Sequence, residues 1–167
     1  GTQAMGALGV VTLNEAERIG FAADMAGSLS MEALQGIIDA FNPELLAVRP
    51  HAEIQEVGAR IRYFLEGSKR VTRQGEQRMQ DAYSLRCIPQ VHAASWQSFA
   101  HAERVVHIEV NATTDNPVVL ECGDVLSGGH FHGQPIAFAM DFLKFGVAEW
   151  ANISERRTER MVNPHLN

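Results

Sequence analysis

The most chemically suggestive part of the chain is residues 80–86, which read Gln-Asp-Ala-Tyr-Ser-Leu-Arg. On a helical turn, Gln80, Tyr83 and Arg86 are three residues apart and can face one cavity. A planar guanidinium beside a phenol suits a small molecule that carries a carboxylate. The spacing predicts a substrate clamp, but it also fits a structural role in which Asp81 and Arg86 only tie a loop to neighbouring helices.

A second polar segment, Gly-Gly-His-Phe-His-Gly-Gln at residues 128–134, leads into Pro135. Glycine-rich turns of this kind let a backbone approach a ligand closely. The segment has neither a phosphate-loop ending nor a dinucleotide fingerprint, so it does not indicate a nucleotide site. His130 and His132 have no Cys, Asp or Glu partner at a recognised ligand spacing, so we predict no metal. We expect Phe131 to pack and His132 to form hydrogen bonds.

Other polar residues have ordinary structural explanations. Asp115 and Asn116 stand before a proline, which is typical of a turn after a helix. The charged run at residues 155–160 resembles solvated ion pairs, which would gain functional weight only if buried. Cys87 has no base that the sequence identifies, so nucleophilic catalysis is not indicated. Three histidines share one predicted helix without the spacing of a zinc motif and are expected at the surface or satisfied in the core: His92, His101 and His107.

Hydrophobic residues recur mostly at helical spacing along the chain. We expect helices at residues 3–25, 31–41 (capped by Ser30), 54–64, 89–111 and 135–161, with a polar loop at 67–79. Residues 118–127 contain a Gly-Asp turn between short apolar runs, which predicts a small β-hairpin. The fold class expected is therefore all-α, a bundle of long helices with one small hairpin, and residues 1–167 are treated as a single unit.

Two of these helices carry clear apolar stripes. The expected buried residues are Ala94, Phe99, Ala102, Val106 and Val110 in the first, and Ile136, Met140, Leu143, Val147 and Trp150 in the second. Helices of this length normally bury their stripes in a large multi-helix core. We therefore expect apolar surface that needs a partner, and hence a homo-oligomer.

The composition limits the class of protein. The 167 residues are 46% hydrophobic and 20% charged, which is typical of a globular protein with one sizeable core. A net charge of -6 without a basic run makes nucleic acid and an anionic membrane surface unexpected partners. The opening apolar stretch is too short to span a bilayer, so no membrane anchor is predicted. Two cysteines form no disulfide framework, which favours a reducing compartment and makes cytoplasm the expected location.

Four blocks together resemble the aromatic amino acid ammonia-lyases, and most closely their histidine-specific branch. The resemblance spans essentially the whole chain. The blocks, in order, are Gly1-Thr2-Gln3; residues 80–87 with Pro89-Gln90-Val91-His92; Thr114-Asp115-Asn116-Pro117; and residues 128–133 with Asn152-Ile153-Ser154-Glu155-Arg156-Arg157.

The resemblance implies a helix-rich cytoplasmic homotetramer that uses an electrophilic methylidene-imidazolone (MIO) made from an internal Ala-Ser-Gly. No Ala-Ser-Gly occurs in this sequence. A tyrosine of the family's N-terminal lid loop and a carboxylate nearer the C-terminus also have no counterpart here. The chain is therefore expected to be part of the central helical domain of a larger lyase.

The resemblance also implies roles for individual residues. Arg86 would bind the substrate carboxylate, Tyr83 would serve as a hydrogen-bonding or acid/base phenol at the reacting centre, and Gln80 would line the substrate. Phe131 would pack beside the electrophile. Three residues would support the site: Asp115, Asn116 and His132.

The reaction implied is loss of ammonia from L-histidine to give urocanate. Because family sites draw residues from three subunits, the chain alone is expected to be inactive. His130 stands where histidine-specific members usually have asparagine, which is a departure from the pattern of that branch. Two alternatives remain open: a tyrosine or phenylalanine ammonia-lyase or aminomutase, and a non-catalytic helical assembly module.

Overall fold

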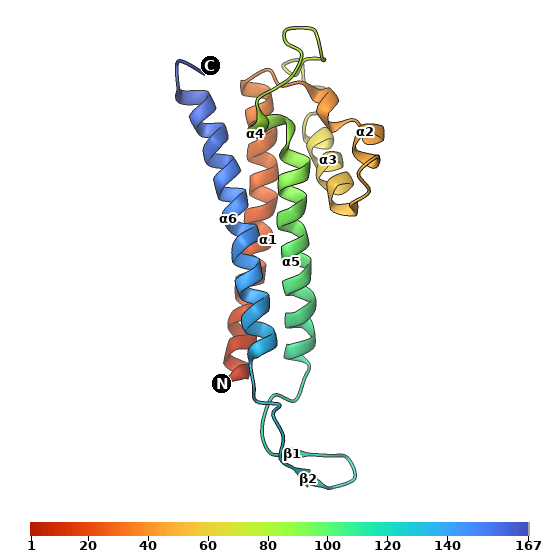
Figure 1. Ribbon diagram of the computed structural model, residues 1–167, viewed down its shortest axis with the longest axis vertical. Helices are drawn as coiled ribbons and strands as arrows, with labels where there is room; N and C mark the ends of the chain where they lie inside the picture. Colours follow the sequence, from red (N-terminus) through yellow and green to blue (C-terminus); the bar gives the residue numbers. More distant parts are fainter. Residues whose placement is uncertain (167) are drawn as a thin grey trace.

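Three long helices form an elongated bundle in the computed structural model, which describes residues 1–166 (Figure 1). They are α1 (Thr2–Ala33), α5 (Ile88–Val110) and α6 (Gln134–Val162). Short elements gather at one end: a 3-10 helix (Ile38–Phe41), α2 (Pro43–Ala47), α3 (Ala52–Phe64) and α4 (Tyr83–Arg86). The prediction of an all-α bundle with one small hairpin is confirmed.

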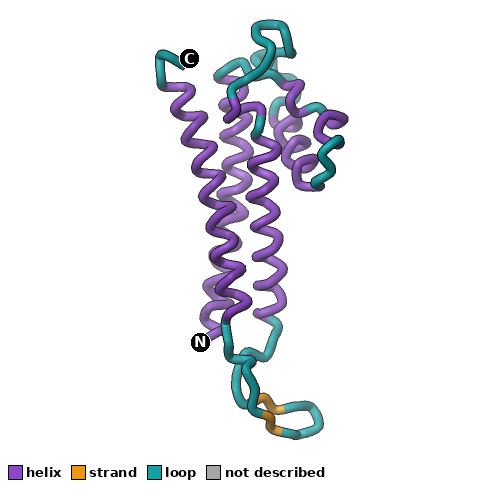
Figure 2. Tube along the Cα trace, in the orientation of Figure 1, coloured by secondary structure: helices purple, strands orange, loops and turns teal. Residues whose placement is uncertain are grey.

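The hairpin lies at the opposite end of the bundle (Figure 2). Its strands, β1 (Val118–Val119) and β2 (Val125–Leu126), are antiparallel, with Val118 opposite Leu126 and Val119 opposite Val125. Gly123 has a φ of 91°, a conformation that glycine adopts without steric cost, and it closes the turn between the strands.

The core has two parts. One fills the bundle between α1, α5 and α6, and the other lies where the short helices pack on α1 and α5. The first contains Leu13, Ala16, Ala23, Phe99, Ala102, Val106, Ile136, Ala139, Leu143 and Trp150. The second contains Met31, Phe41, Leu46, Ile54, Val57, Ile61, Leu65, Leu85, Ile88 and Ala93. The second part holds α4 against the bundle because it includes Leu85.

The first helix is longer than predicted, and the assignment of Ser30 as a helix cap is wrong. Ser30 lies inside α1, where its Oγ donates to the carbonyl of Ala26 at 2.8 Å. A serine can satisfy its hydroxyl in this way without ending a helix. The helix predicted at residues 31–41 does not form as one unit, because residues 31–33 belong to α1 and residues 38–41 form the 3-10 helix. Asn42 caps the next helix, α2, where its Oδ1 accepts from the N–H groups of Glu44 (2.8 Å) and Leu45 (3.3 Å).

The stripe predicted for residues 89–111 is correct in its middle and wrong at two positions. Phe99, Ala102 and Val106 are buried, but Ala94 is exposed and Ala93 is buried instead. A shift of one residue turns a side chain by about 100° on a helix, so a small phase error moves it off the buried face. Val110, the last residue of α5, is also exposed.

The loop at residues 65–82 is tied to the segment after α1. Ile38 N–H donates to the carbonyl of Thr72 at 3.0 Å, and Thr72 N–H donates to the carbonyl of Gly36 at 2.9 Å. The carboxylate of Asp39 accepts from Arg73 Nη1 at 2.8 Å and from Gln74 N–H at 2.7 Å. These contacts fix the chain just before α4.

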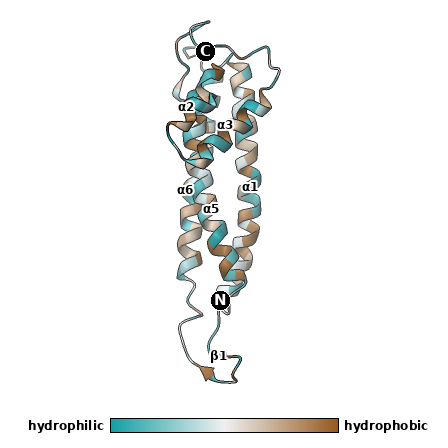
Figure 3. Ribbon diagram, turned by 90° about the vertical axis from the view of Figure 1, so that its right-hand side faces the viewer, coloured by the Kyte–Doolittle hydropathy of each residue, from teal (hydrophilic) through white to brown (hydrophobic). Residues whose placement is uncertain are grey.

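Much apolar surface remains on the outside of the bundle, and Figure 3 shows brown, hydrophobic stretches along the long helices. The exposed large residues on α1 and α6 are Met5, Leu8, Val10, Val11, Ile19, Phe21, Met25, Leu29, Phe138, Phe142, Phe145 and Val162. A groove of about 670 Å³ runs between α1 and α6 among such residues. Over the described part of the chain, no helix combines the length and apolar character that crossing a membrane requires.

Candidate active-site residues

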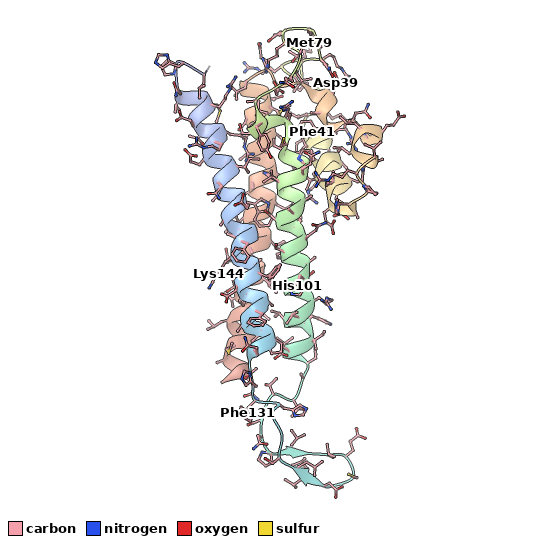
Figure 4. All side chains as sticks on the ribbon, viewed as in Figure 1. Asp39, Phe41, Met79, His101, Phe131 and Lys144 are labelled. Atoms are coloured by element: carbon pink, nitrogen blue, oxygen red, sulfur yellow. The ribbon has the colours of Figure 1, made fainter. Side chains whose placement is uncertain are left out.

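The guanidinium of Arg86 and the amide of Gln80 lie together at the end of the bundle where α4 begins. Gln80 precedes α4, Arg86 is its last residue, and Arg86 Nη1 donates to Gln80 Oε1 at 2.5 Å. Both line a depression of about 210 Å³ together with Asp39 and Met79, and Figure 4 labels the latter two at this end of the molecule. Arg86 is half-buried, so its guanidinium remains accessible to a ligand.

Tyr83 does not share this depression. Its side chain is 69% exposed and lines a neighbouring hollow of about 420 Å³ with Glu149 and Asn152 of α6. The expectation that three residues face one cavity therefore holds within this chain only for Gln80 and Arg86. Gln80 precedes α4, which is a single turn from Tyr83 to Arg86, so the helical spacing assumed for the three residues does not extend to Gln80.

Asp81 has the structural role that was left open. It is 5% exposed, and its carboxylate accepts from the N–H of Ile37 at 2.5 Å and from Arg78 Nε at 2.7 Å. Arg78 in turn donates to the carbonyl of Leu34 at 2.8 Å. Asp81 thus ties the loop to the end of α1, whereas Arg86 takes no part in these contacts.

The glycine-rich turn at residues 128–133 packs against the start of α1 at the other end of the bundle. The hydroxyl of Thr2 donates to the carbonyl of Phe131, and the ring of Phe131 is 55% exposed. His132 Nδ1 accepts from the N–H of Gln134 at 3.2 Å, where α6 begins. The turn therefore presents Phe131 outward while Thr2 and His132 hold its backbone.

Asn116 and Asp115 support the same turn. Asn116 Oδ1 accepts from Ser127 Oγ at 3.0 Å and from Gly128 N–H at 2.7 Å. The exposed Asp115 accepts from the N–H of Asn116 at 2.8 Å. Asn116 joins the two sides of the hairpin base, which is the contact expected of a residue that shapes the turn.

The two groups of predicted site residues lie at opposite ends of the molecule. Figure 4 shows Phe131 at the end far from Met79 and Asp39. The 23-residue helix α5 runs between the two ends, and at about 1.5 Å per residue it is about 35 Å long. A single copy of this chain therefore cannot place Arg86 and Phe131 against one small ligand.

Sequence reasoning missed a buried charged cluster beneath α4. Asp24, His92 and Arg157 are each at most 1% exposed. His92 Nδ1 lies 2.5 Å from Asp24 Oδ1, Arg60 Nε donates to Asp24 Oδ2 at 2.8 Å, and Arg157 Nη2 donates to Ser154 Oγ at 2.8 Å.

A signal for the burial of Arg157 was present in the sequence. Ile136, Leu143 and Trp150 follow each other at intervals of seven residues, and the next position in that series is Arg157. The adjacent Arg156 faces outward and pairs with Glu155. His92, by contrast, is the satisfied core histidine that was one of the two expectations for it.

The cysteine beside Arg86 and the arrangement of possible metal ligands also bear on the chemistry. Burial raises the pKa of the Cys87 thiol, although the charge of Arg86 opposes this, and a thiol kept neutral is a poor nucleophile. Within residues 1–166, no cluster of three or more His, Cys, Asp or Glu side chains is arranged to hold a metal ion.

This fold and these residues can be compared with known proteins. The sequence model of the family described as aromatic amino acid lyase matches residues 1–167, and the chain belongs to this family. Histidine ammonia-lyase of Bacillus velezensis is 58% identical over all of the chain, which spans 33% of that relative's length.

Solved structures of the same family have the same fold. Histidine ammonia-lyase from Trypanosoma cruzi is 42% identical with a TM-score of 0.89, over 99% of this chain and 30% of that chain. Tyrosine aminomutase from Streptomyces globisporus is 32% identical with a TM-score of 0.92, over 97% and 35% of the two chains.

Proposed function

We propose that the protein containing this chain is a histidine ammonia-lyase, which eliminates ammonia from L-histidine and gives urocanate. The observation that carries the proposal is the 58% identity to a histidine ammonia-lyase over the whole chain. Identity to a tyrosine-acting relative of very similar backbone is only 32%. Backbone similarity does not separate substrates within this fold, so the sequence identity has to decide.

In this proposal Arg86 binds the substrate carboxylate. Its half-buried guanidinium, oriented by Gln80 at 2.5 Å, leaves further N–H groups free to donate to a carboxylate. Tyr83 is 69% exposed, so its phenol is open to solvent and a ligand or another chain can cover it. A phenol normally titrates near 10, so its use as an acid or base near neutrality requires such a change of environment.

The family's MIO electrophile would come from sequence outside this chain, because no Ala-Ser-Gly occurs here. The exposed ring of Phe131, on a turn held by Thr2 and Asn116, fits a role as a packing surface for such a group. When present, the electrophile would activate the amino group of the substrate as a leaving group. Phe131 would keep water from the reacting atoms, and His132 would support its turn.

We further propose that residues 1–167 are one unit of a helical domain that assembles as a homotetramer in the cytoplasm. The separation of Arg86 from Phe131 by the length of α5 supports sites built from different copies. The exposed apolar residues of α1 and α6 supply surface for such contacts. Cys87 and Cys122 are both free, which fits a reducing compartment.

The experiment that tests the proposed function is a substrate comparison with the full-length protein. Purified enzyme is supplied separately with L-histidine, L-tyrosine and L-phenylalanine, and the ultraviolet absorbance of the unsaturated acid and the release of ammonia are followed. We expect turnover of L-histidine. Preferred turnover of L-tyrosine or L-phenylalanine would support a tyrosine or phenylalanine enzyme. No turnover of any of the three amino acids would support the non-catalytic assembly module.

A further inference from the structure

A chain of buried polar contacts connects α1, α3, α5 and α6 to the inner side of α4. Arg60 on α3 and His92 on α5 both bond to the carboxylate of Asp24 on α1, and Trp96 Nε1 lies 3.4 Å from Asp24 Oδ2. On the other side of the imidazole, Arg157 Nη1 on α6 lies 3.4 Å from His92 Nε2. Such a buried network costs desolvation and rigidifies the elements that it joins.

The neighbours of His92 determine its protonation. Arg157 can only donate, so His92 Nε2 must accept, and the ring proton must then be on Nδ1, where it is donated to Asp24. His92 is therefore neutral and bonded on both sides. Burial also lowers its pKa, and the hydrogen bond to Asp24 opposes this only in part.

The network ends on the backbone of α4. Arg157 Nη1, which approaches His92, also lies 3.5 Å from the carbonyl oxygen of Ser84. Ser84 is buried, and it lies two residues before Arg86 in the sequence. A single-turn helix has few contacts of its own to set its rotation, and here α4 receives an apolar contact through Leu85 and a polar one through Arg157.

We propose that Arg157, oriented by His92 and Asp24, is a positioning residue that sets the rotation of α4 and thereby the directions of Tyr83 and Arg86. The catalytic consequence rests on the proposed function, but the structural coupling does not. Arg157 contacts no substrate. It acts through the carbonyl of Ser84, with Ser154 holding the other end of the guanidinium.

Protonation of His92 would break this arrangement. The charged groups that face the ring are Asp24 from α1, Arg60 from α3 through Asp24, and Arg157 from α6, while α4 contributes only the neutral carbonyl of Ser84. A protonated imidazole would have no acceptor for Arg157 and would place two cations 3.4 Å apart. The position of α4 is therefore coupled to pH through one side chain.

The test uses four variants of the full-length protein. Arg157→Met removes the donor, and His92→Leu removes both bonds of the imidazole. His92→Gln keeps one donor and one acceptor at a similar separation but cannot titrate. Arg18→Met is the matched control, because Arg18 is an exposed arginine that pairs with Glu15 on the same helix. Backbone hydrogen exchange of a peptide covering residues 83–88 and steady-state kinetics are measured for each variant.

In Arg157→Met and His92→Leu, we expect exchange in residues 83–88 to be about tenfold faster than in the control. We expect kcat/KM for L-histidine to fall on the order of 10²-fold. His92→Gln should keep wild-type exchange and lose any acid-side decline that wild type shows below pH 6.5.

Unchanged exchange in residues 83–88 in either variant would overturn the proposal. If Arg157→Met does not fold, exchange in residues 83–88 is compared between His92→Leu and His92→Gln. Equal exchange rates in these two variants would count against the proposal. If wild type lacks activity on L-histidine, the proposed function fails, while the exchange measurement still decides the coupling.

Discussion

The polar residues near α4 differ in their burial and in their contacts. Arg86 is half-buried and bonded to one amide, so it keeps donors for a ligand. Asp81 and Arg157 are buried and bonded to backbone carbonyls, amides or neighbouring side chains. Residue type and spacing predicted that Gln80, Tyr83 and Arg86 face one cavity, and the structure brings only the first and the last of these together. The burial of Arg157 was indicated only by the seven-residue spacing of the apolar residues before it on α6.

Replacing Arg86 is the residue-scale test of the clamp. In the full-length enzyme, we expect Arg86→Met to lower kcat/KM for L-histidine by about 10- to 100-fold, the value of a hydrogen bond to a charged group. The loss should appear mainly as a higher KM, measured by steady-state kinetics. Arg18→Met serves as the control, since Arg18 is exposed and pairs with Glu15 on the same helix. An unchanged KM would show that another group binds the carboxylate.

The buried His92 gives a prediction for stability against pH. Its folded pKa is lower than the ordinary 6.5, so below about pH 6.5 the unfolded chain binds this proton more readily than the folded one. The free energy of unfolding should therefore fall as pH decreases below 6.5 and stop falling below the folded pKa. Denaturant titrations of wild type and His92→Gln between pH 4.5 and 7.5 measure this. Parallel profiles for the two proteins would contradict it.

Among the elements, the long helices were easier to predict than the short ones. Hydrophobic spacing over many residues located α5 and α6 closely, whereas Ser30 was misassigned because a serine can bond inside a helix as well as cap one. The break at Asn42 was visible from the proline that follows it. The short α4 could not be delimited, because its position depends on contacts with distant residues such as Arg157.

The contact between α5 and α6 depends on Gly146. A Cβ at this position would lie 2.9 Å from the carbonyl oxygen of Ser95, a backbone atom that cannot move without shifting α5. We expect Gly146→Ala to lower the free energy of unfolding by about 1–3 kcal/mol through overpacking. Thermal unfolding checks this against Gly129→Ala, where a Cβ meets nothing within 4 Å. Equal midpoints for the two variants would contradict the close packing.

At the scale of the whole molecule, the sequence indicated the helical bundle, the hairpin and the family. It did not indicate that residues 80–86 and 128–133 are separated by the length of α5, because each segment read alone shows only local chemistry. Under the proposed function, their meeting in one site would require other copies of the chain. The apolar faces of α1 and α6 are the part of this structure that an assembly can cover.

The exposed phenylalanines of α6 give a prediction about assembly. Phe138, Phe142 and Phe145 are 63%, 55% and 67% exposed, and burying such rings favours association. We expect the full-length protein to be an oligomer by light scattering. Replacing all three residues by serine should shift the protein toward smaller oligomers. Replacing the exposed Lys144 on the same helix, as Lys144→Gln, should not. A wild-type monomer at high concentration would contradict this.

Mixing two impaired full-length variants tests whether the two ends of this chain serve one kind of site through different copies. At L-histidine concentrations well below KM, Arg86→Met and Phe131→Ala are each expected to retain at most about a tenth of wild-type activity. When the two are co-expressed, a site that takes Arg86 from one copy and Phe131 from another is intact in about a quarter of random combinations. We expect recovery of about that fraction of wild-type urocanate production. Background activity in mixed oligomers whose hetero-assembly has been verified by mass would contradict it.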